Sequence, residues 1–358
     1  MSSEYPPVHY SDYLKVSELT QLQKPRSAEL GTEVHDETLF IVIHQVYELW
    51  FKQILFELDS ALETFSKDKI DEREMLTVNH RLQRIIEIQK VLIAQVDVLD
   101  TMTPMDFLEF RDYLYPASGF QSLQFKLVEN KLGLKDRLTY NNKNYKESLC
   151  PMDQAPATES EDSPSLFTLL EKWLERTPFL SVENFNFWDN YRKAAEYRME
   201  QNRIKAEKYS QDETTKKRHL DAVESMERTF KSIFDEKEYK KMQEEGHWRI
   251  SHKALCAALF IYLYRDEPIL QLPFNMLTHL QTIDENFTQW RYRHALMVHR
   301  MIGAKMGTGG SSGHKYLRDA GDKHKIFQDL NNLATFFLPK SDLPKLPQDL
   351  RDKLGFNY

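Results

Sequence analysis

Two histidines near the carboxyl end of the chain, His294 and His299, lie in the segment FTQWRYRHALMVHRMIG. At about 100° per helical residue, His294 falls in the middle of an apolar stripe and His299 points well away from it, so the two cannot easily share one metal ion. An imidazole on an apolar face needs a partner. A single histidine placed in this way holds many b-type haems, although a core histidine bonded to a carbonyl or an acid is the plainer alternative. The stripe comprises Phe287, Trp290, His294, Met297, Val298 and Met301, and the polar face comprises Asn286, Gln289, Arg293 and Arg300.

A third histidine, His44, lies in the apolar segment TLFIVIHQVYELWFKQILFELDSAL, one helical turn after Phe40 and one turn before Glu48. An imidazole and a phenyl ring that project together from a buried helix suit a flat, partly polar ligand, which they would hold by stacking and one hydrogen bond. Two alternatives stay open. His44 can be a core residue paired with Glu48, or the two can form a small metal site, which is weaker because HExxH and paired ExxH patterns are absent.

Arg111 lies in DFLEFRDYL with Phe107, Leu108 and Leu114 on its own helix face. A guanidinium group on an apolar face needs a carboxylate, preferably in bidentate geometry. An internal Asp or Glu would provide one, and so would a bound acid, so Arg111 alone does not decide between them.

The segment GTGGSSG, residues 307–313, directly follows the helix of His294. It offers main-chain N–H groups and the hydroxyls of Thr308, Ser311 and Ser312. Its spacing does not match the phosphate-binding P-loop. The segment is therefore either a flexible linker or a lid that closes over a small anionic or zwitterionic ligand.

Helices must position these residues. The chain has only 11 glycines in 358 residues, and long stretches without Gly or Pro favour helix, whereas sustained apolar and polar alternation is missing. The sequence therefore predicts an all-α fold with a single large helical domain. Helices are expected at about 32–64, 71–100, 250–264 and 282–302 and near 322–337, with a short one starting at Thr103-Pro104 and stopping before Pro116.

Other stretches are less regular. Residues 1–30 are predicted to form an extended arm with short helical turns. The Pro-, Ser- and acid-rich stretch 145–165 is predicted to be an exposed loop, and the densely charged residues 191–232 a projecting helical hairpin. The main domain is expected to span 31–340, and a proline-punctuated tail 341–358.

Composition limits the classes of partner. The chain carries 48 basic and 55 acidic residues, a net charge of -7, which argues against a general nucleic-acid binder. Only two cysteines, Cys150 and Cys256, favour a reducing compartment. The amino terminus lacks a signal-peptide core, and no stretch approaches the roughly 20 uninterrupted apolar residues of a membrane span. We therefore expect a cytoplasmic protein without membrane or nucleic-acid partners.

Taken together, these segments resemble one family. LFIVIHQVYELWFKQ, DFLEFRDYLYPASGFQSLQF, WLERTPFL, NFNFW, WRYRHALMVHRMIG and GTGGSSG occur in the order typical of the tryptophan 2,3-dioxygenase family, from about residue 8 to about residue 340. The resemblance implies an all-helical domain with a haem pocket, assembled as a homotetramer. It also implies a haem b cofactor, O2 as co-substrate, and opening of the indole ring of L-tryptophan between C2 and C3 to give N-formylkynurenine, the first step of the kynurenine pathway.

The resemblance also implies roles for individual residues. His294 matches the axial ligand of the haem iron, and Ser118 matches a residue at the haem edge. His44 matches the distal histidine that accepts the indole N–H. Arg111 matches the residue that pairs with the substrate carboxylate, and Thr308 the residue that holds the amino-acid end. Phe40 and Phe107 match the pocket walls, and Tyr10 and Tyr13 the arm tyrosines that reach a neighbouring subunit's pocket.

The sequence differs from relatives at a few positions. Ser11 replaces a usual glycine, and Thr38, Ile43, Lys126 and Ala304 differ from the animal enzymes; none of these is a predicted ligand or substrate anchor. Two other functions stay open: a haem protein that senses tryptophan or a gas without turnover, and a helical scaffold in which His294 and Arg111 are core residues.

Overall fold

The computed structural model describes residues 5–134, 144–182, 185–210, 212–307 and 313–355. Within these residues the secondary structure is almost entirely helical. The only strands described are a two-residue antiparallel pair, β1 (Ser181–Val182) and β2 (Phe185–Asn186). The prediction of an all-α class is confirmed.

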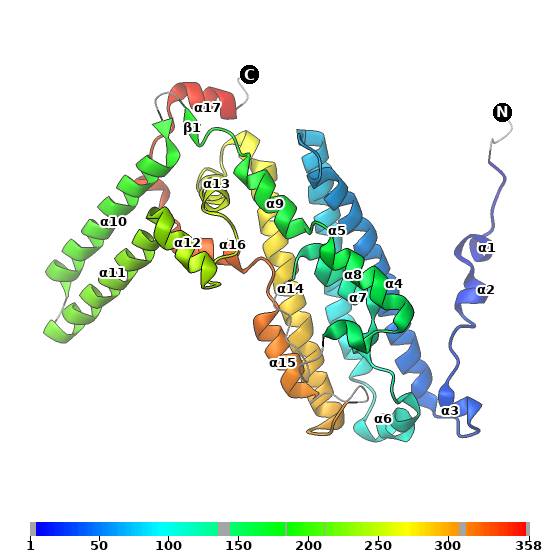
Figure 1. Ribbon diagram of the computed structural model, residues 1–358. Helices are drawn as coiled ribbons and strands as arrows, with labels where there is room; N and C mark the ends of the chain where they lie inside the picture. The colour runs from blue at the N-terminus through cyan, green and yellow to red at the C-terminus, as the bar shows by residue number, and fades with distance from the viewer. Residues whose placement is uncertain (1–4, 135–143, 183–184, 211, 308–312, 356–358) are drawn as a thin grey trace.

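Three long helices, α4 (His35–Phe65), α5 (Glu72–Leu99) and α14 (Gln271–Ile302), pack side by side and form the body of the domain (Figure 1). The sequence placed the first two within a few residues of these bounds. The third helix was predicted to begin at about residue 282, whereas α14 begins at Gln271 and includes Pro273. A proline is tolerated there because N–H groups in the first turn have no intrahelical partner.

Helix α5 lies between the other two and is bonded to both. The Gln89 amide donates to the main-chain oxygen of Ile283 in α14 at 3.0 Å, and the Gln95 amide donates to that of Ile43 in α4 at 2.9 Å. The Asn286 amide donates to Gln89 Oε1 at 3.2 Å, and Asn286 is buried. Asn286 belongs to the polar face predicted for this helix, but at this position that face is turned toward α5, so the amide is satisfied by a partner on α5 instead of by water.

The short helix α6 (Pro104–Arg111) begins as predicted. The Thr103 hydroxyl accepts the N–H of Asp106, the Asp106 carboxylate accepts the N–H of Thr103, and Pro104 takes the first helical position. The chain then continues through η1 (Asp112–Leu114) and η2 (Gly119–Gln121) to α7 (Leu123–Leu132).

The predicted exposed loop at 145–165 is wrong, because this stretch folds into η3 (Tyr145–Ser148) and α8 (Pro151–Asp162). Pro151 occupies the first helical position, where its missing N–H has no effect. Pro156 gives up one hydrogen bond inside the helix. Packing offsets that loss, because Ala157 is fully buried and its main-chain oxygen accepts from the Asn130 amide of α7 at 3.1 Å.

A pair of helices projects from the body (Figure 1). They are α10 (Phe187–Tyr209) and α11 (Glu213–Phe234), which cover the charged region expected at 191–232. Arg203 of one forms a two-pronged hydrogen bond with Glu227 of the other, at 2.8 Å to each oxygen. Helix α12 (Glu236–Glu244) packs against α11, and α9 (Leu166–Glu175) packs against α4 and α13 (His252–Leu263). Helix α13 lies within the predicted 250–264.

The carboxyl-terminal region differs from the prediction of one helix near 322–337. It contains α15 (His314–Lys323), α16 (Gln328–Asn332) and η5 (Leu333–Phe336). The chain breaks between α15 and α16, where the buried Asp284 carboxylate accepts the N–H groups of Ile326 and Phe327 at 2.9 and 3.1 Å. A side chain from α14 therefore replaces helical hydrogen bonds at this point.

The remaining elements pack against the body or lead away from it. The tail contains α17 (Gln348–Leu354), whose Leu350 and Leu354 are buried. The arm contains α1, α2 and α3 and lies apart from the body for most of its length (Figure 1). The arm helices span Tyr10–Leu14 (α1), Val16–Leu19 (α2) and Arg26–Glu29 (α3). Two further short 3-10 turns, η4 and η6, span Pro268–Leu270 and Lys340–Asp342.

The arm contacts the body mainly where it joins α4. The Glu37 carboxylate accepts the N–H groups of Arg26 and Ser27, and the Gln45 side chain bonds to Gln23 and to the main-chain oxygen of Leu22. Ahead of these contacts the apolar side chains of the arm are largely exposed. The described residues of the arm are thus extended with short helical turns, and their reach to a neighbouring subunit stays a prediction.

Among the described helices, α4 alone is long and apolar enough to cross a membrane by length and composition. This is weak evidence for a membrane span, because a core helix of a folded domain meets the same criteria. In this structure α4 packs against α5, α7 and α9.

Candidate active site

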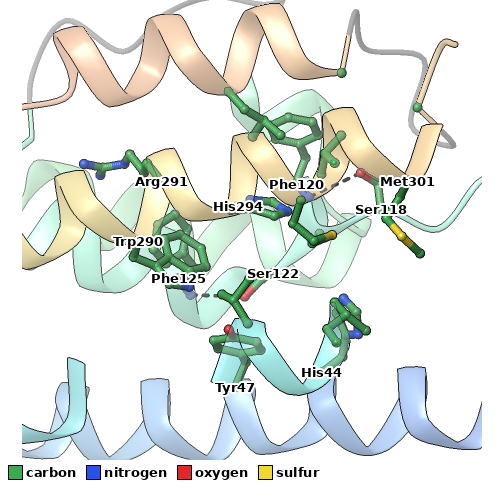
Figure 2. Close-up of a pocket in the computed structure, with 18 of the residues that line it drawn as sticks. His44, Tyr47, Ser118, Phe120, Ser122, Phe125, Trp290, Arg291, His294 and Met301 are labelled. Carbon is green, nitrogen blue, oxygen red and sulfur yellow. Dashed lines mark hydrogen bonds between the residues drawn. The ribbon is translucent and has the colours of Figure 1, made fainter. Parts of the chain in front are cut away.

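A cavity of about 290 Å³ lies between α4 and α14, close to α6 and the start of α15 (Figure 2). Residues from distant parts of the sequence meet in its wall, and most of the wall is apolar. Six of the predicted site residues line it: Phe40, His44, Phe107, Arg111, Ser118 and His294.

His44 faces this cavity from α4 (Figure 2). Its Nδ1 lies 2.7 Å from the main-chain oxygen of Phe40. A carbonyl oxygen only accepts, so Nδ1 carries the proton and Nε2 of the neutral ring is an acceptor. Burial lowers the pKa of His44, against smaller opposing effects of that bond and of Glu48, and the ring is therefore neutral at neutral pH. The pairing of His44 with Glu48 is not formed, since the Glu48 carboxylate accepts from Gln124 at 2.9 Å.

His294 faces the same cavity from α14 (Figure 2). Burial, and to a lesser degree the charge of His44, lowers the pKa of His294 to about 4. Its ring stacks on Trp290, one turn earlier, with ring centres 5.6 Å apart. Among the described hydrogen bonds and ion pairs, none involves its ring nitrogens. The alternative of a core histidine bonded to a carbonyl or an acid therefore finds no support in the described residues, and the neutral imidazole offers a nitrogen to the cavity.

Aromatic rings border the cavity on the side of His44. The ring centre of Phe40 is 4.1 Å from that of His44 and 5.9 Å from that of Phe107. Phe110, fully buried, backs both phenylalanines at 5.6 and 5.4 Å. Rings at these separations hold one another at fixed tilts, and an aromatic ligand in the cavity could stack beside them.

Arg111 ends α6 at the cavity wall. Its guanidinium group donates to the main-chain oxygen of Met306, close to the glycine-rich segment. No carboxylate of the described residues lies within ion-pair distance of it. Of the two partners that the sequence left open, an internal acid is thus not seen among these residues, and the cation remains able to bind an acid in the cavity.

The glycine-rich segment meets the cavity at both ends, because Gly307 and Gly313 line the wall. Thr308, predicted to hold the substrate, lies outside the described residues. The arm tyrosines Tyr10 and Tyr13 are 75% and 74% exposed, so this chain does not bring them to its own cavity.

Ser118 lies in the cavity wall at the start of η2. Its hydroxyl accepts the N–H of Phe120 at 3.4 Å (Figure 2). Its own N–H donates to the side chain of Gln121 at 3.2 Å. Four residues later the Ser122 hydroxyl accepts the N–H of Phe125 at 3.2 Å, which starts α7. These two serines fix the turns that carry the wall from α6 to α7.

One group of cavity residues was not predicted from sequence. Glu129 of α7 binds Lys126 and Arg291, each at 3.1 Å, and Arg291 also donates to the main-chain oxygen of His324 at 2.8 Å. All four residues are buried and line the cavity. Lys126 was noted only as a departure from relatives. The others give no periodic signal, because buried charged residues are rare and their partners lie far apart in the sequence.

The described residues contain no group of three or more His, Cys, Asp or Glu side chains that could hold a metal ion. His44 and Glu48 therefore do not form part of a larger protein-ligated metal centre in this part of the chain. A metal at His294 would need most of its ligands from another molecule.

Comparisons with known proteins agree over nearly the whole chain. A family model described as tryptophan 2,3-dioxygenase matches residues 2–337. The chain is 53% identical to "Tryptophan 2,3-dioxygenase" of Bdellovibrio bacteriovorus over 99% of this chain and 100% of that protein. It is 45% identical to the protein of the same name from Alteromonas mediterranea, over 99% of each. It is 47% identical to "Tryptophan 2,3-dioxygenase B" of Danio rerio, over 94% of this chain and 84% of that protein.

Proposed function

The chain belongs to the tryptophan 2,3-dioxygenase family, and we propose that its cavity holds a b-type haem through His294 with the substrate between the haem and His44. The enzyme is a dioxygenase of L-tryptophan. It inserts both atoms of O2 across the C2–C3 bond of the indole, and the product is N-formylkynurenine.

The state of His294 supports the haem proposal. An iron ligand must be a neutral imidazole with a free nitrogen. Burial keeps His294 neutral, and its ring has no hydrogen-bond partner among the described residues. The absence there of a larger group of metal-binding side chains fits a macrocycle that brings its own nitrogen ligands. When bound, the haem supplies the oxygen chemistry that no side chain of the cavity can provide.

His44 would orient the indole. The Phe40 carbonyl holds the proton on Nδ1, so Nε2 can accept the indole N–H. Because the lowered pKa of His44 keeps the ring neutral, Nε2 remains an acceptor at neutral pH. The ring is thus a positioning group, and the phenyl rings of Phe40 and Phe107 complete an aromatic slot for the indole.

Arg111 would bind the substrate carboxylate. Its guanidinium group now contacts a carbonyl oxygen, that of Met306, and a carboxylate in bidentate geometry is a stronger partner. We assign the amino-acid end to Arg111 and Thr308 together, the second from the resemblance alone. With the indole N–H at His44 and the carboxylate at Arg111, two polar contacts fix the ring between them.

Further proposals concern assembly and location. We infer a homotetramer in which Tyr10 and Tyr13 enter a neighbouring subunit's cavity. The exposed aromatic side chains of the arm and its sparse contacts with the body support this assignment. We also propose that the enzyme is cytoplasmic, since it has only two cysteines, and that Ser118 contacts the haem edge.

The observation that carries the proposal is that His44 and His294 face one cavity from two helices, with the His294 ring unbonded among the described residues. The test is the visible absorption spectrum of the purified, haem-reconstituted protein, followed by addition of tryptophan and O2. We expect a haem band and release of N-formylkynurenine. A colourless protein would point to a helical scaffold, and a haem band with tryptophan binding but no product would point to a sensor.

A further inference from the structure

A second pair of histidines lies where α14 ends and α15 begins. The ring centres of His299 and His314 are 4.4 Å apart, and their planes are inclined by 41°. His299 occupies the last turn of α14 and is exposed, and His314 is the first residue of α15. Neither side chain has a hydrogen-bond or ion-pair partner in the part of the chain that the structure describes. Two imidazole rings from different helices thus lie in contact near the surface, and no hydrogen bond or ion pair among the described residues holds either of them.

We propose that His299 and His314 form a binding site for a divalent transition-metal ion of the nickel or copper type. A ring nitrogen binds such ions at about 2.1 Å, and the ring centre lies roughly 1.1 Å further away. With one nitrogen of each ring on the same ion, ring centres 4.4 Å apart would subtend an angle of about 90° at the metal. That is the angle between neighbouring ligands in square-planar and octahedral sites, whereas tetrahedral zinc prefers a wider one.

The chemistry of the two histidines and their neighbours in the sequence indicates which class of metal ion the pair would bind. Each histidine is followed in the chain by a cation, Arg300 and Lys315. A hard cation such as Mg²⁺, which prefers carboxylate and water oxygens, gains nothing from two imidazoles. A transition-metal ion gains two nitrogen ligands and completes its shell with water.

A bound ion would connect the last turn of α14 to the first residue of α15. Gly307 and Gly313 line the cavity, and the main-chain oxygen of Met306 accepts from Arg111. A side chain at Gly313 would lie within 4 Å of Val298 and Ile302, so the start of α15 is already close to the end of α14. The ion would therefore hold the ends of α14 and α15 together beside the proposed tryptophan site, and this consequence for tryptophan rests on the proposed function.

The site itself is tested by titrating the full-length haem-loaded protein with Ni²⁺ in a calorimeter, beside His299→Gln, His314→Gln and the double variant. His80→Gln, an exposed histidine of α5, is the control. We expect each site variant to lose at least about tenfold in affinity for one Ni²⁺, and His80→Gln to behave as the parent protein. Mg²⁺ in excess should not displace the ion. One-to-one Ni²⁺ binding that survives unchanged in both single variants would overturn the site.

The connection to the cavity has its own readout. Amide hydrogen exchange near Met306 and at the start of α15 should slow when Ni²⁺ is added to the parent protein, and should not change in His314→Gln. Unchanged exchange at saturating Ni²⁺ would overturn the connection, even though the calorimetric site stands. Neither measurement uses turnover, so failure of the proposed tryptophan chemistry would be seen separately, as a lack of product.

Discussion

The main-chain oxygen of Phe40 lies 2.7 Å from Nδ1 of His44, and this contact fixes which nitrogen of the imidazole carries the proton. The acceptor comes from the same helix, one turn earlier, so no side-chain substitution removes it. Nε2 is left as the acceptor that faces the cavity. Two properties of His44 can therefore be tested separately: the charge of the ring, which pH changes, and the acceptor nitrogen Nε2, which a substitution of His44 removes.

The first prediction concerns the pH dependence of tryptophan binding. Burial lowers the pKa of His44 from its ordinary 6.5, so the ring stays neutral as the pH falls past that value. Only at lower pH does protonation turn Nε2 into a donor and remove the acceptor for the indole N–H. We expect the KM for tryptophan to stay flat from about pH 8 to 6.5 and to rise below.

In the same experiment His44→Ser should retain bound haem and measurable turnover, with a higher KM and without that acid rise. A KM that climbs between about pH 8 and 6.5 in the parent enzyme would contradict the lowered pKa. Complete loss of turnover in His44→Ser with normal tryptophan binding would instead identify an essential base.

The second prediction concerns the haem ligand. His294→Ala should lose the haem absorption band, because the cavity then offers no neutral nitrogen from α14. His299→Ala, on the same helix but outside the cavity wall, should keep most of it. Absorption spectra after reconstitution with equal amounts of haem measure this directly. Equal loss in both variants would refute the assignment to His294.

The third prediction concerns the carboxylate of the substrate. Arg111→Lys should raise the KM for tryptophan by about one to two orders of magnitude, because lysine cannot reproduce the two-pronged contact. Tryptamine, which lacks the carboxylate, should be a poor substrate of the parent enzyme and should change little in the variant. Arg228→Lys on the projecting hairpin is the control. If Arg111→Lys penalised tryptophan and tryptamine equally, Arg111 would be structural.

The fourth prediction concerns the arm. Removal of residues 1–30 should raise the KM for tryptophan if Tyr10 and Tyr13 complete a neighbouring cavity. Subunits without the arm, co-assembled with full-length subunits that carry Arg111→Ala, should regain activity, because intact arms then reach intact cavities. The size of each assembly in solution shows whether tetramers form. No recovery in mixed assemblies that do form would show that the arm does not complete a neighbouring cavity.

The fifth prediction concerns stability. Gly133 ends α7 with φ +105°, and a Cβ there would lie 2.6 Å from Ser165 Oγ and 2.7 Å from Phe167 Cβ. Gly133→Ala should therefore lower the free energy of unfolding by about 3 kcal/mol or more. Gly246 also has a positive φ, +80°, but open space around it, so Gly246→Ala should cost only about 1 kcal/mol. Denaturant titration of both variants separates the clash from the backbone strain.

The sequence predicted the elements whose signals are local. The hydroxyl, proline and carboxylate at Thr103, Pro104 and Asp106 determine the start of α6 by themselves. The long apolar pattern of α4 acts in the same way. Helical periodicity also placed His294 on an apolar stripe and His44 in a largely apolar helix, but that the two face one cavity was implied only by the family resemblance and is seen in the structure.

The sequence did not predict elements that are stabilised or ended by side chains far away in the sequence. Helix α8 is stabilised through Asn130 on α7, and the break at 324–327 is imposed by Asp284 on α14. Both override local propensity through contacts that no window of sequence contains. The buried cluster around Glu129 was missed for the same reason, since its partner Arg291 is 162 residues away.

Helix α5 separates the two helices that carry the histidines, and this has a consequence for the range of substrates. Val96 and Leu99 of α5 are buried and also line the cavity. They hold no ligand and donate no hydrogen bond from their side chains, so their size can change without altering the chemistry of His44, Arg111 or His294. Leu99 belongs to the apolar cluster against which Phe40 and Phe107 pack, so shortening it would enlarge the cavity near these two rings. Redesign toward bulkier indoles should therefore begin on α5. A smaller side chain there enlarges the cavity and lowers the free energy of unfolding, while every polar contact of the site is kept.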